Sequence, residues 1–204
     1  MTARSELILG GQRSGKSRRA ELLARDWLEQ SPEHKAVMIA TAMAWDDEMV
    51  ERIARHQQDR AERVPGMSTV EESIALGEVI QTHSQAQTLV VVDCLTLWLT
   101  NLLMPYEEAE NCPKSIKNDL KNASYMPIAQ QMHMQEATLL VAIKNALGPV
   151  ILVGNEIGLG VIPMGRDTRD FVDTLGRLNQ EVAAACERVT FMAAGLTLTL
   201  KGQT

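Results

Sequence analysis

Residues 10–17, GGQRSGKS, constrain the fold of this chain more than any other stretch of it. They follow the apolar run Leu7-Ile8-Leu9, and their spacing, Gly-x-x-x-x-Gly-Lys-Ser, fits a phosphate-binding loop between a buried strand and a helix. Glycines let backbone N–H groups close on phosphate oxygens, and the following helix directs its free N–H groups at the same oxygens. Lys16 can reach the β and γ phosphates, and the Ser17 hydroxyl can bind Mg²⁺. An ordinary glycine turn with a helix cap is the less favoured alternative.

Apolar runs alternate with segments of helical periodicity along the rest of the chain. The predicted strands cover residues 6–10, 36–42, 88–93 and 149–155, and the predicted helices cover 15–29, 46–61, 71–83, 95–103, 128–147 and 166–187. The four strands are uniformly apolar, which favours a parallel sheet with helices on both faces. RVTFMAA and LTLTL flank Gly195 and are expected to form a C-terminal antiparallel strand pair. The sequence therefore predicts an α/β fold of the P-loop nucleotide-binding class.

We expect residues 1–204 to form one such domain, because the length suffices for one core and no repeat or second domain is visible. Residues 105–127 hold three prolines and many Asn, Lys and Glu residues, which is typical of an irregular insertion or lid.

Charge and composition exclude several kinds of partner. The net charge of −6 argues against nucleic acid. The most apolar run, TLVVVDCLTLWLTNLLM, is interrupted by Asp93, so no membrane span is expected. The N-terminus shows no signal peptide, and three cysteines without a C-x-x-C pair favour reduced thiols in the cytoplasm.

Asp93 ends the apolar strand LVVVD and is the predicted acidic partner of the phosphate-binding loop. Such loops hold Mg²⁺ with the help of an acidic residue at the end of another buried strand. The alternative role is to cap the helix that begins after Cys94, and the two roles are compatible. The N-K-x-D guanine reader of signalling GTPases is absent.

His56 has an unusual setting on the helix predicted for residues 46–61. Arg52, His56 and Arg60 are successive i, i+4 neighbours and share one side of that helix. Arginine charge disfavours the imidazolium form, so the ring is expected to be neutral near pH 7 and a competent nucleophile toward phosphorus. A partly buried surface histidine is the alternative that spacing alone leaves open.

These stretches together resemble the bifunctional adenosylcobinamide kinase/adenosylcobinamide-phosphate guanylyltransferase family of cobalamin biosynthesis. The resemblance covers most of the chain outside 105–150. It rests on GGQRSGKSRRAE (10–21), IATAMAWDDEMVERIARHQQDR (39–60), STVEE (68–72), VVVDCLTLWLTNLL (90–103), NEIGLGVIPMGRDTRDFVDTLGRLNQEVA (155–183) and AAGLTLTLKG (193–202).

The resemblance implies two reactions. A nucleoside triphosphate, ATP or GTP, phosphorylates the aminopropanol hydroxyl of adenosylcobinamide. GTP then gives GMP to an enzyme histidine with release of pyrophosphate, and GMP passes to adenosylcobinamide phosphate to give adenosylcobinamide-GDP. The resemblance also implies a homo-oligomer, a trimer in the family.

The resemblance further implies site residues. The guanylylated histidine of its R-I-x-x-H pattern is His56, and Lys16 is the second catalytic residue. Metal contacts fall on Ser17 and Asp93. Nucleotide contacts fall on Gly10, Gly11, Gln12, Arg13, Ser14, Gly15, Lys16, Ser17, Ala40, Thr41, Ala42, Gln57, Gln58, Asp59, Arg60, Glu71 and Asp93.

Two other functions remain open from the sequence. One is a P-loop small-molecule kinase without a covalent step, in which His56 is structural. The other is a GTP-binding regulatory protein whose loop holds nucleotide without productive chemistry.

Overall fold

The computed structural model describes residues 3–43, 47–103 and 127–203, and it leaves the side chains of residues 47, 48, 52 and 56 outside the description. The described residues contain one sheet of seven strands in the order β3-β2-β4-β5-β1-β6-β7. The strands are β1 (Ser5–Gly10), β2 (Lys35–Ala40), β3 (Met67–Glu71), β4 (Thr88–Asp93), β5 (Val150–Val153), β6 (Arg188–Ala193) and β7 (Leu196–Lys201).

Strand direction in the sheet follows the prediction. All neighbouring strands are parallel except β6 and β7, which form the antiparallel C-terminal pair. The central strands are parallel and covered on both faces, and Leu7-Ile8 of β1 and Val90-Val91-Val92 of β4 are fully buried. The mostly parallel α/β fold is therefore confirmed.

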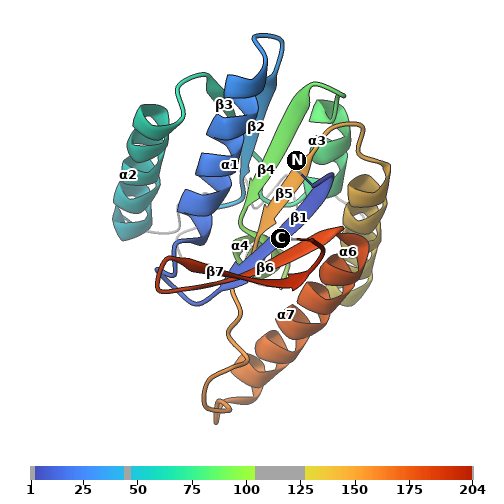
Figure 1. The fold of residues 1–204 in the computed structure, drawn as a ribbon. Coiled ribbons are helices and arrows are strands. Elements are labelled where there is room, and N and C mark those ends of the chain that lie inside the picture. Colours follow the sequence, from blue (N-terminus) through green and yellow to red (C-terminus); the bar gives the residue numbers. More distant parts are fainter. Residues whose placement is uncertain (1–2, 44–46, 104–126, 204) are drawn as a thin grey trace.

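Six helices of the described residues pack around the sheet: α1 (Lys16–Gln30), α2 (Asp47–Arg63), α3 (Leu76–His83), α4 (Leu95–Leu103), α6 (Ile128–Asn145) and α7 (Arg166–Ala185). Ala20 and Ala24 of α1 pack with Ile8 and Met38 on one face. Side chains of α3, α4, α6 and α7 form a second cluster on the other face. Figure 1 shows α1 and α2 to one side of the twisted sheet and α3, α6 and α7 to the other.

One predicted boundary is wrong. The helix expected from residue 71 begins at Leu76, and Met67–Glu71 form the strand β3 instead. β3 is an edge strand whose side chains are largely exposed, so it carries no uniformly apolar run to mark it. The Glu72 carboxylate accepts the N–H groups of Ile74 and Ala75 and fixes the turn before α3.

The predicted insertion or lid at 105–127 lies, apart from Pro127, outside the described residues. Within the described part, no helix is long and apolar enough to cross a membrane. The extent of the domain, residues 1–204, stays a prediction.

Candidate active site

The phosphate-binding loop is shaped by its glycines and by the β6–β7 hairpin. Gly10 (φ 154°) lies so close to β6 that a Cβ there would stand 2.4 Å from the Met192 carbonyl oxygen. Gly15 (φ 101°) occupies the left-handed region at the start of α1, which favours glycine. The Gly195 N–H in the β6–β7 turn donates to the Ser14 carbonyl at 3.0 Å. The hairpin therefore supports the loop from behind.

Lys16 folds back over this loop. Its Nζ donates to the Gly11 carbonyl oxygen at 2.6 Å and lies 3.5 Å from Ser14 Oγ. The side chain is buried, and burial lowers the pKa of the Lys16 ammonium, while the negative charge of Asp93 opposes that shift. A buried cation at the N-terminus of a helix attracts an anion that would compensate its lost hydration.

Asp93 is the last residue of β4, so it lies at the carboxyl ends of the parallel strands, as the phosphate-binding loop does. It is aligned with Ala40 of β2 and with Val153 of β5, and β5 separates β4 from the loop strand β1. The charge of Asp93 favours the ammonium form of Lys16 and acts to raise its pKa against the effect of burial, so the predicted lysine and carboxylate act on each other electrostatically. The next residue, Cys94, is buried, and burial raises the pKa of its thiol to about 12, which makes it a packing residue and not a nucleophile.

A cleft of about 470 Å³ opens between α2 and the carboxyl ends of β2 and β3. Its α2 wall is mostly apolar, and its opposite wall is acidic and polar. Gln57 of α2 donates through Nε2 to Glu71 Oε1 at 3.1 Å across the cleft. The lining residues are Ala42, Met43, Val50, Ile53, Ala54, Gln57, Glu71, Glu72 and Ser73.

His56 lies within α2 between two residues of this lining, Ile53 and Gln57. Its side chain, like that of Arg52, lies outside the described residues. The nucleophile role predicted for His56 is therefore untested by the geometry, although its backbone position borders the cleft.

Comparison with known proteins decides the family. The family model for cobinamide kinase / cobinamide phosphate guanyltransferase matches residues 6–200. The chain belongs to that family.

Two relatives of this family illustrate how far the likeness extends. The chain is 43% identical over 199 residues to the bifunctional adenosylcobalamin biosynthesis protein CobP of Pseudomonas aeruginosa, covering 97% of this chain and 98% of the relative. It is 34% identical over 195 residues to the bifunctional adenosylcobalamin biosynthesis protein CobU of Escherichia coli, covering 96% and 98%. The flagellar accessory protein FlaH of Methanocaldococcus jannaschii has a similar fold, with a TM-score of 0.52 at 11% identity over 100% of this chain and 80% of that one.

Three of the nucleotide contacts expected from this family, Ala42, Gln57 and Glu71, meet in the cleft. Three others bond to structural neighbours. Gln58 donates to Glu62, Asp59 pairs with Arg63 at 2.8 Å, and the buried Arg60 donates to Thr69 of β3. Thr41 is fully buried, and its hydroxyl exchanges hydrogen bonds with the backbone of Cys94. The nucleotide contacts themselves stay predictions for all of these residues.

Several residues around the site escaped sequence reasoning. The Glu156 N–H donates to the Gly10 carbonyl at 3.1 Å, so the segment after β5 lies against the loop. The apolar wall of the cleft is formed by Val50, Ile53 and Ala54. Their helical spacing is the one sequence signal that indicated such an apolar face. The turn at Gly195 was predicted, but its contact with the phosphate-binding loop left no signal in the sequence, because Gly195 and Ser14 lie almost a whole chain length apart.

Proposed function

We propose that this chain catalyses both reactions expected of its family: phosphorylation of adenosylcobinamide by a nucleoside triphosphate, and transfer of GMP from GTP to adenosylcobinamide phosphate. One observation carries the proposal. The Lys16 loop and the cleft beside His56 both lie at the carboxyl ends of strands of one sheet, and we expect a single nucleotide to contact both. Ligands of open α/β sheets gather at this edge, outside the carboxyl ends of the strands.

The triphosphate of the nucleotide is placed on Gly10–Ser17, and the nucleoside is placed toward the cleft. Glu71 offers a carboxylate that can accept the N1–H and N2–H groups of guanine, which adenine lacks. Gln57 holds that carboxylate through one hydrogen bond and leaves the other oxygen available. We propose that the remaining contacts expected from the family also surround the nucleotide. They are Ala40, Thr41, Gln58, Asp59 and Arg60.

The residues present fit a Mg²⁺ ion that is shared with the nucleotide. Among the described residues, no three His, Cys, Asp or Glu side chains gather as metal ligands. Ser17 and Asp93 would supply two oxygens, and Mg²⁺ in such sites takes its other ligands from phosphate and water. When bound, the ion would neutralise charge that develops on the phosphate oxygens.

We propose that His56 is the nucleophile of the guanylyl transfer. A neutral imidazole nitrogen attacks the α-phosphorus of GTP, a P–N bond forms, and the bond to the bridging oxygen breaks to release pyrophosphate. The phosphate oxygen of adenosylcobinamide phosphate then attacks the same phosphorus, the P–N bond breaks, and the imidazole is restored. Lys16 holds the β and γ phosphates while pyrophosphate leaves.

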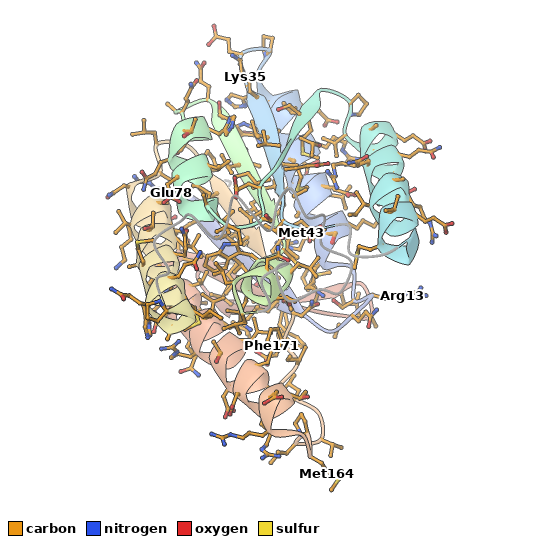
Figure 2. All side chains as sticks on the ribbon, turned by 180° about the vertical axis from the view of Figure 1, so that it is seen from behind. Arg13, Lys35, Met43, Glu78, Met164 and Phe171 are labelled. Atoms are coloured by element: carbon orange, nitrogen blue, oxygen red, sulfur yellow. The ribbon has the colours of Figure 1, made fainter. Side chains whose placement is uncertain are left out.

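We also propose that the enzyme works as a homo-oligomer, a trimer as in its family. Apolar side chains stand exposed on the segment after β5 and on β7, among them Val161 (95% exposed), Met164 (97%) and Leu198 (60%). Figure 2 shows Met164 at the outer tip of α7, far from the sheet. Exposed apolar patches often mark protein contact surfaces, and these two segments are the candidates for one.

For location, we propose the cytoplasm, which supplies GTP and ATP. The described cysteines, Cys94 and Cys186, are buried free thiols, which agrees with a reducing compartment.

The test is product analysis. Purified protein is mixed with Mg²⁺, GTP and adenosylcobinamide, and the corrinoids are separated by chromatography and identified by mass spectrometry. We expect adenosylcobinamide phosphate followed by adenosylcobinamide-GDP and pyrophosphate. Accumulation of adenosylcobinamide phosphate alone would support the alternative of a kinase without guanylyl transfer. No turnover of either corrinoid would support the alternative of a GTP-binding regulatory protein.

A further inference from the structure

Asn101 is a buried amide on the mostly apolar helix α4. Only 2% of its surface is exposed, and its neighbours on α4 include Leu95, Leu99 and Leu102 of the core. A buried amide lowers stability unless it is hydrogen-bonded, and a leucine would pack better at such a position. The hydrogen-bond partners of Asn101 explain why an amide stands at this position.

The Nδ2 group of Asn101 bonds to two segments that belong to the cleft wall opposite α2. It donates to the Thr41 carbonyl oxygen at 2.8 Å and to the Ser73 carbonyl oxygen at 3.2 Å. Thr41 directly precedes the lining residue Ala42, and Ser73 is itself a lining residue. We call residues 41–43 the first lip of the cleft and residues 71–73 the second lip. The two hydrogens of one amide thus connect the two lips.

The rest of the second lip is held from the same helix. Trp98, three residues before Asn101 on α4, donates through Nε1 to the Ile74 carbonyl at 2.8 Å. The Glu72 N–H donates to the Ala40 carbonyl at 3.0 Å, which joins the second lip to the end of β2. The first lip is fixed to the residue before α4 by the Thr41 hydroxyl, which donates to the Cys94 carbonyl at 2.8 Å. Asn101 is the one described side chain of α4 that bonds to both lips.

We propose that Asn101 is a positioning residue for nucleoside recognition, setting the spacing of the two cleft lips against the phosphate-binding loop. This inference rests on the proposed function, in which the nucleoside part of GTP enters the cleft. Glu71 stands on the second lip, so a shift of that lip moves its carboxylate away from the base. The phosphate-binding loop has its own supports in Met192 and Gly195 and does not depend on Asn101.

The experiment compares two ligands on Asn101→Asp. The variant keeps the shape of the side chain but replaces both N–H donors by a carboxylate that faces two carbonyl oxygens. Calorimetry with Mg²⁺ measures the Kd for GTP and for inorganic tripolyphosphate. We expect GTP to bind about ten-fold more weakly, the loss typical of a buried hydrogen bond, and tripolyphosphate to bind as in the wild type. Lowering the pH should restore part of the GTP affinity, because a protonated carboxyl can again donate to one lip.

Thr100→Val is the matched control. It removes a hydroxyl from the same helix, and among the described residues that hydroxyl donates to the Thr96 carbonyl within the helix. It should leave both affinities unchanged. Trp98→Phe is the second variant if Asn101→Asp does not fold, and it should weaken GTP binding by a smaller factor while sparing tripolyphosphate.

Three results would overturn the inference. They are unchanged GTP affinity in folded Asn101→Asp, an equal loss for GTP and tripolyphosphate, and an equal loss in Thr100→Val. The wild type tests the proposed function separately. If it binds GTP no better than tripolyphosphate, the cleft does not receive the nucleoside, and both proposals fail together.

Discussion

Lys16 shows how a single buried charge prepares this site for its ligand. Its ammonium is withdrawn from water, bonds to one carbonyl of its own loop, and has its pKa lowered by burial. The charged form is therefore destabilised in the nucleotide-free protein, and a bound triphosphate removes that destabilisation. Burial of the Lys16 ammonium therefore lowers the stability of the nucleotide-free protein and raises its affinity for a triphosphate.

Lys16→Ala should weaken tripolyphosphate and GTP binding by roughly 100-fold, the loss expected for charge-assisted hydrogen bonds, and should stop both reactions. Calorimetry and the corrinoid product assay measure the two effects. Lys35→Ala, at the opposite end of the sheet in Figure 2, is the control. Loss of the kinase step alone would contradict a site shared by both reactions.

A second residue links stability to pH. Burial, followed by the charge of Glu181, raises the pKa of the Glu136 carboxyl on α6. When the pKa of a carboxyl is higher in the folded than in the unfolded protein, the carboxyl stabilises the fold fully at a pH below the unfolded-state pKa. That contribution is lost as the pH rises through the folded-state pKa. Arg177 of α7 lies 3.7 Å away and opposes the shift without cancelling it.

We therefore expect Glu136→Gln to gain stability relative to the wild type as the pH rises from acid to neutral, by a few degrees in Tm. Thermal unfolding across that range measures it, with Glu78→Gln as an exposed control. Parallel Tm curves for the Glu136→Gln and wild-type proteins would show that the carboxyl titrates normally.

At the scale of elements, the β6–β7 hairpin determines the shape of the phosphate-binding loop. Gly10 touches the Met192 carbonyl, and Gly195 donates to Ser14. The motif in residues 10–17 therefore predicts the loop, but its support comes from the other end of the chain. The same holds for Asn101, whose two carbonyl partners lie 60 and 28 residues away in sequence. Local pattern predicts elements well and predicts contacts between distant elements poorly.

Gly10→Ala tests this support. A Cβ there would stand 2.4 Å from the Met192 carbonyl oxygen and requires either strand to move, so we expect a loss of about 2 kcal/mol in the free energy of unfolding. Gly11→Ala is the matched control for stability, because its Cβ would meet no atom within 4 Å. Urea unfolding measures both. Equal stability of the two variants would mean that the β6–β7 hairpin moves to accommodate the added Cβ without loss of stability.

For the whole molecule, the sequence predicted the order of most elements, the parallel sheet and the antiparallel end. It missed β3 because that strand is an exposed edge, and it did not predict the cleft because a cleft arises from the packing of α2 against two strand ends. Exposed leucines alternate along β7, and we propose this edge strand as the surface for contact between copies of the chain.

Leu198→Asp should shift the protein from a trimer toward a monomer of 22.5 kDa, because a buried charge at the contact is costly. Light scattering after size-exclusion chromatography measures the mass. Leu147→Asp, also on an exposed leucine, is the control and should leave the mass unchanged. A wild-type monomer would contradict the proposed oligomer.

The most direct measurement is covalent labelling with GTP that carries radioactive phosphorus at the α position. We predict one acid-labile label per active chain, located on His56 by peptide mass spectrometry and absent from His56→Ala. No label, or a label that survives His56→Ala, would contradict guanylyl transfer through this histidine.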